Sequence, residues 1–322
     1  MKIMLTGGTG FIGSYVLRFL LDEGYRVNAL LRDSSKLVLK NHSALKIFEG
    51  DINNKNEVKK SLSGCDVVIH LAALVRTKAD NPKEFFDTNF KGTENLLLAS
   101  RQNDVKKFVF TSSLSAHSII PHPFVTEEYL RKPQKYFSEY AETKGRAEEL
   151  VVNFGEKGLP YVIIYPQRLF GIGPLTDANG ATKALQLYMR NTLPFLINSG
   201  NQFASWSFVE DVARGIISAA VKKVYNQKYI LGGENKTLSD VYKMADKISG
   251  KAHLKIYLKS STALSLASVM EKSAVILRKN PLITKEWLNY VLDSQKVSSE
   301  KAINELNYKI TPIETALEKT IN

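Results

Sequence analysis

The chain has 322 residues, of which 44% are hydrophobic and 24% charged, and its formal net charge is +12. This length accommodates a large buried core, either in one large α/β domain or, as we expect, in a main domain with a smaller lobe. The composition and the absence of a long uncharged apolar run exclude a disordered chain and a membrane-spanning protein.

Lysine and arginine are scattered along the chain rather than collected in one arm. We therefore interpret the positive charge as a solvated surface that also suits an anionic cofactor or substrate, and we expect no nucleic-acid partner. The single cysteine, Cys65, cannot form an internal disulfide and has no second thiol for a metal site. We expect a buried thiol, no metal, no signal peptide and a cytoplasmic location.

The sequence KIMLTGGTGFIG at residues 2–13 joins a short β-prone run to four glycines. Residues 3–5 predict a buried strand, residues 11–21 an apolar helix and residues 26–31 a second strand, which makes a βαβ unit. Glycine permits a tight turn, a close approach of backbone to pyrophosphate and close helix packing, with the phosphates at the helix N-terminus. We predict a dinucleotide site with two overlapping spacings, Gly7-x-x-Gly10-x-x-Gly13 and Gly8-x-Gly10-x-x-Gly13.

Strand-like and helical stretches alternate up to about residue 165, with β-rich segments at 67–71, 108–111 and 162–165. This alternation predicts a doubly wound parallel sheet. The first of these segments is followed by small residues, which would let a cofactor lie against the carboxyl end of the strand. We expect His70, in that strand, to be packed into the sheet rather than to act as a base.

Beyond Pro166 the alternation weakens, and glycine-rich loops are expected to reach over the substrate. The last expected helix is apolar; we interpret it as part of a smaller lobe, with association at a membrane surface as the alternative. The expected elements are a strand at 203–208, a helix at 210–221, a strand at 229–231 and helices at 238–248 and 262–277. The expected domains are a nucleotide-binding domain at 1–166, to which 203–233 return, and a mainly helical substrate lobe at 167–202 and 234–322.

Tyr140 and Lys144 lie four residues apart in the helical segment SEYAETKGRAEEL, so both side chains lie on one helix face. A tyrosine has a pKa of about 10, and a neighbouring ammonium favours the phenolate. Tyr140 is thus a candidate general acid or base beside a nicotinamide. A surface pair is the alternative, but a strand at 107–111 precedes it and leads into Ser112 and Ser113, where a doubly wound fold places its ligands.

Together these motifs resemble the short-chain dehydrogenase/reductases, in the extended branch that includes nucleotide-sugar epimerases and dehydratases. The pattern is similar to dihydroflavonol-reductase-like and 3β-hydroxysteroid-dehydrogenase-like members. The resemblance implies a Rossmann fold, a nicotinamide cofactor, a small-molecule substrate and a homodimer formed through two helices beside the active site. It spans nearly the whole chain and rests on TGGTGFIG, GDI at 50–52, HLAA at 70–73, TNFKGTENLL around Asn89, TSS, YAETK and FVEDVARG at 208–215.

The resemblance also implies roles for individual residues. Tyr140 would be the catalytic acid or base, Lys144 would tune it and hold the nicotinamide ribose, and Ser113 would orient the substrate, with Ser112 as the adjacent alternative. A helix cap is the alternative for Asn89. The implied cofactor contacts are Gly7, Gly10, Phe11, Ile12 and Gly13 at the pyrophosphate, Asp51 and Ile52 at the adenine, Leu71, Ala72 and Ala73 along the channel, Asn89 at the strand end, Pro166 and Leu169 at the nicotinamide, and Tyr140 together with Lys144.

The cofactor choice depends on Arg32. Family members that prefer NAD usually carry an acid at the end of the second strand, where this chain has Leu31, Arg32 and Asp33. The segment GYRVNALLRDSS is similar to the dihydroflavonol reductases, in which an arginine lies on the 2′-phosphate, and the planar guanidinium suits a phosphate. We therefore predict NADP. The alternative is NAD, with Asp33 binding the ribose.

Three functions remain open from the sequence. The first is an NADP-dependent oxidoreductase that acts on a ketone or secondary alcohol of a medium-sized, partly apolar molecule. The second is a nucleotide-sugar epimerase or dehydratase that regenerates its cofactor. The segment YPQRLFGIGP at 165–174 lacks the asparagine that such enzymes commonly place there, although Arg168 could still bind an anionic group such as a diphosphate. The third is a non-catalytic NADPH sensor, against which the intact Ser113, Tyr140 and Lys144 argue.

Overall fold

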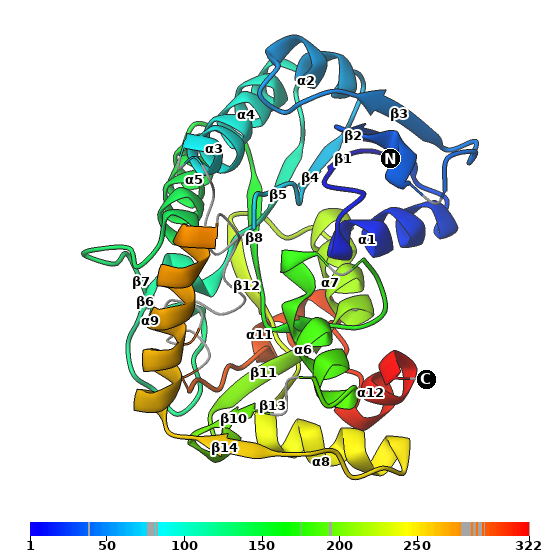
Figure 1. The fold of residues 1–322 in the computed structure, drawn as a ribbon. Helices are drawn as coiled ribbons and strands as arrows, with labels where there is room; N and C mark the ends of the chain where they lie inside the picture. The colour runs from blue at the N-terminus through cyan, green and yellow to red at the C-terminus, as the bar shows by residue number, and fades with distance from the viewer. Residues whose placement is uncertain are drawn as a thin grey trace.

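The structure, a computed structural model, describes residues 1–37, 39–75, 81, 83–174, 176–192, 195–277, 285, 288, 292 and 294–321. Its main feature is a parallel seven-stranded sheet in the order β12-β8-β5-β4-β1-β2-β3 (Figure 1). This order, which runs outward in both directions from β1, confirms the predicted doubly wound fold. The strands are β1 (Lys2–Thr6), β2 (Arg26–Leu31), β3 (Leu45–Glu49), β4 (Val67–His70), β5 (Lys107–Thr111), β8 (Tyr161–Pro166) and β12 (Gln227–Leu231).

The central strands are apolar because both of their faces are buried. In β1, Ile3, Met4 and Leu5 are fully buried, and Ile3 pairs with Val27 of β2 on one side and Val67 of β4 on the other. Side chains alternate across a strand, so Ile3 and Leu5 belong to one core cluster and Met4 to the other. The sheet reverses its winding between β1 and β4, and ligands of such sheets bind at the carboxyl ends there.

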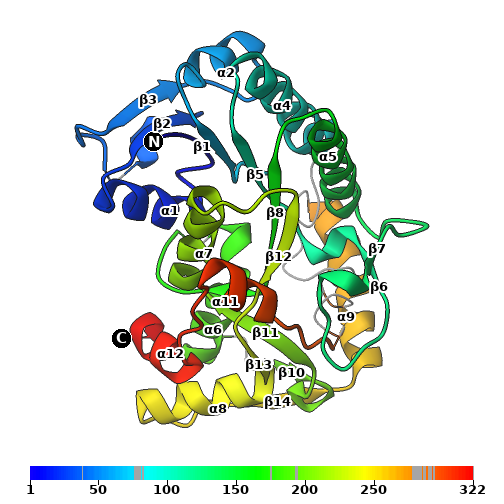
Figure 2. The same cartoon turned by 180° about the vertical axis from the view of Figure 1, so that it is seen from behind.

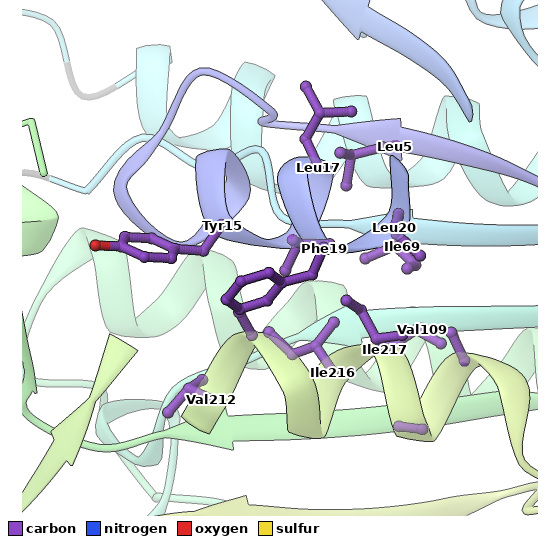
Figure 3. Close-up of a cluster of buried hydrophobic side chains, with 14 of the residues drawn as sticks. Leu5, Tyr15, Leu17, Phe19, Leu20, Ile69, Val109, Val212, Ile216 and Ile217 are labelled. Atoms are coloured by element: carbon purple, nitrogen blue, oxygen red, sulfur yellow. The ribbon is translucent and has the colours of Figure 1, made fainter. Parts of the chain in front are cut away.

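Helices cover both faces of the sheet (Figures 1 and 2). One face carries α1 (Phe11–Asp22) and α7 (Val209–Val221), whose apolar side chains meet between the helices, as Figure 3 shows for Phe19, Ile216 and Ile217. The other face carries α2 (Lys55–Ser61), α4 (Gly92–Gln102) and α5 (Glu139–Glu156). The short elements are η1 (Ser34–Lys36), α3 (Lys83–Phe85), η2 (Phe86–Lys91), η3 (Leu114–Ala116), β6 (Ser118–Ile119), η4 (Glu127–Tyr129) and β7 (Leu130–Arg131).

A smaller lobe lies beyond the carboxyl edge of the sheet (Figure 1). A third core cluster, with Phe170, Trp206 and Tyr242 among its members, holds it together. The predicted helix at 262–277 is confirmed as α9 (Ser260–Leu277), and none of the described helices is long and apolar enough to cross a bilayer. The other elements are β9 (Leu169–Phe170), η5 (Asp177–Asn179), α6 (Gly180–Met189), β10 (Phe195–Ile197), η6 (Asn198–Gly200), β11 (Phe203–Phe208), β13 (Glu234–Thr237), α8 (Leu238–Ser249), β14 (Ile256–Leu258), α11 (Glu300–Leu306) and α12 (Ile313–Ile321).

The stretch 203–233, expected to return to the nucleotide-binding domain, is divided between the two parts of the molecule. Its helix α7 packs on α1, and its strand β12 pairs with β8 at the edge of the large sheet. Its first strand, β11, instead pairs with β9 and β13 in a separate sheet, because Trp206 and Phe208 pack against Phe170 in the lobe. The boundary between nucleotide and substrate domains stays a prediction.

Candidate functional site

The glycine-rich turn after β1 lies directly against the chain that leaves β4. Gly7 has a φ of 74°, in the left-handed region that favours glycine. A Cβ on Gly7 would lie 2.7 Å from the backbone nitrogen of Ala72 and 2.8 Å from the carbonyl carbon of Leu71. A Cβ on Gly13 would lie 1.9 Å from the carbonyl oxygen of Gly7. Only glycine fits at these two positions, because any larger residue would place its Cβ against backbone atoms.

Helix α1 starts at this turn. Its N-cap residue is Gly10, and no side chain among the described residues caps it. The amides of a first helical turn, here those of Phe11 and Ile12, attract an anion through their N–H groups and the helix dipole. The Phe11 ring is buried, so this residue offers its backbone rather than its side chain. A turn with glycine at positions 7, 10 and 13, followed by a helix whose first amides have no side-chain cap, fits the pyrophosphate of a dinucleotide cofactor.

At the end of β4, a row of hydrogen bonds that all donate in the same direction connects β1, β4 and α4. His70 is 1% exposed; its Nδ1 lies 2.7 Å from Thr6 Oγ1 and its Nε2 lies 2.9 Å from Thr93 Oγ1. Thr6 Oγ1 accepts the amide of Ala72, and Thr93 Oγ1 donates to the carbonyl of Asn89. Nδ1 therefore accepts and Nε2 donates. Burial lowers the pKa of His70 to about 3, so the ring is neutral and packed into the sheet, as predicted.

Asn89 lies inside the π-helix η2, so the helix-cap alternative does not hold. Its Oδ1 accepts the amide of Leu74 at 2.7 Å, and its Nδ2 donates to the Leu74 carbonyl and to Thr143 Oγ1, each at 3.2 Å. Asn89 thus joins the segment after β4 to helix α5, one residue before Lys144. Single π-turns inside helices are frequent at functional sites.

Helix α5 carries Tyr140 and Lys144 on successive turns. It starts after Ser138, whose Oγ accepts the amide of Ala141, and Tyr140 is half-buried in its first turn. Lys144 is 3% exposed; its Nζ donates to the carbonyl of Thr111 at the end of β5 and lies 4.1 Å from the centre of the Phe110 ring. Burial lowers the pKa of Lys144 to about 7. The amine is therefore fixed at the carboxyl end of a central strand, where its protonation changes near neutral pH.

The two serines after β5 point in different directions. Ser112 is 4% exposed, and its Oγ donates to the Glu148 carboxylate at 2.7 Å. Ser113 is the half-buried N-cap residue of η3; its Oγ lies 2.8 Å from Ser115 Oγ and accepts the Ser115 amide. Because the Ser112 hydroxyl is bonded inside the protein, Ser113 is the better placed of the two to meet a substrate, with the Ser115 hydroxyl beside it.

Sequence reasoning missed Ser115 and Glu148. Glu148 follows Lys144 by one further helical turn, so the four-residue spacing that singled out Tyr140 and Lys144 also includes Glu148. Its carboxylate is buried among four donors. Burial opposes its ionisation, but the hydrogen bonds from His117 and Lys228 and the charge of Lys228 outweigh that cost and lower the pKa of Glu148 to about 2.

The remaining predicted contact residues lie at the ends of their strands. Asp51 follows β3, and its Oδ1 accepts the Asn53 amide at 2.8 Å; Ile52 is buried next to it. Pro166 ends β8 and Leu169 begins β9, while Ala73, like its neighbour Ala72, is half-buried after β4. Arg32 is exposed at the end of β2. Within the described part of the chain, no hydrogen bond or ion pair joins Arg32 or Asp51 to the glycine turn or to helix α5.

Comparison with known proteins gives one family match and several relatives. The model of the NAD dependent epimerase/dehydratase family matches residues 3–232. A Synechocystis sp. protein named as a dihydroflavonol 4-reductase is 26% identical over 99% of this chain and 93% of its own. A 3-beta-hydroxysteroid dehydrogenase of Mycolicibacterium neoaurum is 29% identical over 68% of this chain and 60% of its own. The solved UDP-glucuronic acid 4-epimerase of Bacillus cereus, in complex with UDP-glucuronic acid and NAD, is 25% identical with a TM-score of 0.78, covering 100% of this chain and 98% of its own.

Proposed function

Because the chain belongs to the NAD-dependent epimerase/dehydratase family, we propose that it is an NADP-dependent oxidoreductase. It interconverts a ketone and a secondary alcohol on a medium-sized, partly apolar molecule. The observation that carries the proposal is the Lys144 amine, anchored at the end of β5 one helical turn from Tyr140 and on the helix that packs against the turn bearing Ser113. Relatives named as a reductase and a dehydrogenase support it.

Each side chain of the site has a distinct task in this reaction. The cofactor supplies the hydride when bound. Ser113 donates a hydrogen bond to the substrate carbonyl oxygen, and Tyr140 gives that oxygen its proton in the reductive direction. Lys144, when protonated, stabilises the phenolate that remains and so makes Tyr140 a stronger acid. Burial lowers the pKa of this amine to about 7. In the same low dielectric, its interaction with a nearby phenolate or ribose oxygen is stronger than that of an exposed lysine.

The end of β2 favours NADP over NAD. Asp33, the candidate ribose acceptor, is occupied by its own turn: its Oδ1 accepts the Ser35 amide and hydroxyl, and Lys36 lies 3.5 Å from its other oxygen. Within the described residues Arg32 makes no ion pair or hydrogen bond and is exposed. The Arg32 guanidinium is thus available to bind the 2′-phosphate of NADP, whereas the Asp33 carboxylate is already hydrogen-bonded to Ser35.

Arg32→Ala is expected to raise the NADPH dissociation constant about 10-fold and to leave NADH within about twofold, because a hydrogen bond to a charged group contributes ~1.5 kcal/mol. The measurement is fluorescence titration with both cofactors. Arg26→Ala is the matched control, since Arg26 is also exposed and lies at the opposite end of β2. Equal weakening of NADPH and NADH would show that Arg32 does not contact a phosphate.

A nucleotide-sugar 4-epimerase is the second candidate, favoured by the full-length similarity to the solved 4-epimerase. The two candidates differ in their use of cofactor. A reductase consumes NADPH with a ketone, whereas an epimerase interconverts sugars without net cofactor consumption. NADPH absorbance with a panel of ketones, run beside chromatography of UDP-, GDP- and dTDP-sugars, separates them. Epimerised sugar without NADPH loss would replace the reductase assignment.

The organisation of the protein follows from the same proposal. Residues 1–166, together with α7 and β12, bind the nucleotide, and the lobe around β11, α6 and α8 holds the substrate. Leu71, Ala72, Ala73, Pro166 and Leu169 line the cofactor channel, and Asp51 and Ile52 flank the adenine. We expect a homodimer, which light scattering of the purified protein would test. We also expect a cytoplasmic location.

A further inference from the structure

One oxygen of Glu148 binds both ends of the turn that carries Ser113. Ser112, two residues before η3, donates to Glu148 Oε2 at 2.7 Å. His117, immediately after η3, has its Nε2 at 3.0 Å from the same oxygen. The residues between them are Ser113, Leu114, Ser115 and Ala116, so this short segment is held at its two ends by a single atom. We refer to residues 113–116 as the serine turn.

The other oxygen of Glu148 faces away from the serine turn. Glu148 Oε1 accepts the Tyr165 hydroxyl at 2.7 Å and the Lys228 ammonium at 2.8 Å. A carboxylate offers about four acceptor positions, and all of them are used here. Glu148 is 4% exposed, so the network lies in a region of low dielectric, where each hydrogen bond is stronger and each loss more costly.

Glu148 also belongs to the helix that carries the proposed acid and its lysine. Tyr140, Lys144 and Glu148 follow one another at four-residue intervals on α5, and α5 packs against η3. The Ser112 amide donates to the Ile164 carbonyl, which fixes the same stretch to β8. The serine turn is therefore attached to the sheet through the backbone of Ser112, and to α5 through the Glu148 side chain and the packing of η3 on that helix.

From this geometry we propose that Glu148 is a positioning residue, which sets the distance between the serine turn and the Tyr140–Lys144 helix face. It does not touch substrate or cofactor. It acts through Ser112 and His117, which bring the Ser113 hydroxyl to the carbonyl oxygen that Tyr140 protonates. The inference rests on the proposed oxidoreductase function. Two groups that act on one oxygen must be placed to within a fraction of an ångström, so loss of the connection affects the chemical step more than binding.

The test compares three variants of the full chain. Glu148→Leu removes the one oxygen that accepts the hydrogen bonds of both Ser112 and His117. We expect kcat to fall about 10- to 100-fold while the NADPH dissociation constant changes less than about twofold. Glu148→Gln keeps a carbonyl oxygen with two lone pairs for Ser112 and His117. Its amide nitrogen then faces the Tyr165 hydroxyl, which can accept, and the Lys228 ammonium, which is 36% exposed and can turn to water. We expect kcat within about threefold of the wild type. Tyr165→Phe is the matched control, because it removes a buried donor to the same carboxylate on the side away from the serine turn.

Three results would overturn the proposal. These are wild-type kcat in Glu148→Leu, an equal loss in Glu148→Gln and Glu148→Leu, and a loss in Tyr165→Phe as large as in Glu148→Leu. If Glu148→Leu does not fold, the double variant Ser112→Ala, His117→Phe replaces it, since it leaves the carboxylate in place. The phenyl ring preserves the edge contact that His117 makes with Tyr165.

A second measurement does not depend on the reaction. Hydrogen–deuterium exchange of peptides spanning residues 111–118 is expected to accelerate in Glu148→Leu and to stay at the wild-type rate in Tyr165→Phe. Unchanged exchange in Glu148→Leu would refute the connection to the serine turn, whatever the enzyme catalyses. Wild-type protein that turns over no ketone, but shows the expected exchange, would refute the oxidoreductase function and retain the connection.

Discussion

Tyr140→Phe is expected to lower kcat by ~10² to ~10⁴, the range that general acid catalysis contributes. The phenyl ring keeps the half-buried packing of Tyr140 in the first turn of α5 and removes only the hydroxyl. NADPH binding should therefore change little. Steady-state kinetics give kcat, and fluorescence titration gives the dissociation constant of the cofactor.

The control for this variant is Tyr136→Phe. Tyr136 lies against the same helix, where its hydroxyl would be 2.5 Å from a Cβ placed on Gly145, and it has no part in the proposed reaction. We expect it to retain wild-type kcat. Full activity in Tyr140→Phe would remove Tyr140 from the reaction, and equal losses in both variants would point to a general disturbance of α5.

Lys144→Met is expected to lower kcat by ~10² or more, because it removes the cation that stabilises the phenolate of Tyr140. It should also weaken cofactor binding, since Lys144 is expected to hold the nicotinamide ribose. Methionine has a similar length and suits the apolar surroundings next to Phe110. Unchanged turnover in this variant would contradict the assigned role of the amine.

The same variant should change how stability depends on pH. Burial lowers the pKa of Lys144 from an unfolded value of about 10.4 to about 7 in the folded protein. Between these values the unfolded chain binds more protons than the folded one, so this group adds stability as pH rises and removes it as pH falls. Relative to Lys144→Met, the wild type should gain on the order of 1.4 kcal/mol of unfolding free energy per pH unit from about pH 7 to pH 10.

Urea unfolding at several pH values measures this slope, and Lys107→Met serves as its control. Lys107 is a second buried lysine, and burial lowers its pKa to about 8. It begins β5, whereas the serine turn follows the other end of that strand, and its Nζ donates to the carbonyls at the end of α7. Lys107→Met should alter the pH dependence of stability without altering kcat. A flat difference between wild type and Lys144→Met would show that the buried amine does not titrate as expected.

The local parts of the fold follow from the sequence by itself. The turn after β1 requires glycine at positions where a Cβ would meet backbone, and the apolar run of α1 follows at once, so residues 2–31 predict their structure directly. The four-residue spacing of Tyr140 and Lys144 likewise places both on one helix face without further information. Edge strand β3 was not predicted, because its half-exposed sequence LKIFE gains its strand conformation mainly by pairing with β2.

The tertiary structure decided the features that depend on segments far apart in the chain. It placed β11 in the lobe sheet, because long-range packing against Phe170 determines its partners. It turned the Ser112 hydroxyl onto Glu148 and so separated Ser112 from Ser113, which the sequence could not do for two adjacent serines. The donors to Glu148 come from two strands and a loop, and only folding brings them within hydrogen-bond distance. A spacing along one helix is a local property of the chain, whereas the environment that sets a pKa or orients a hydroxyl is not.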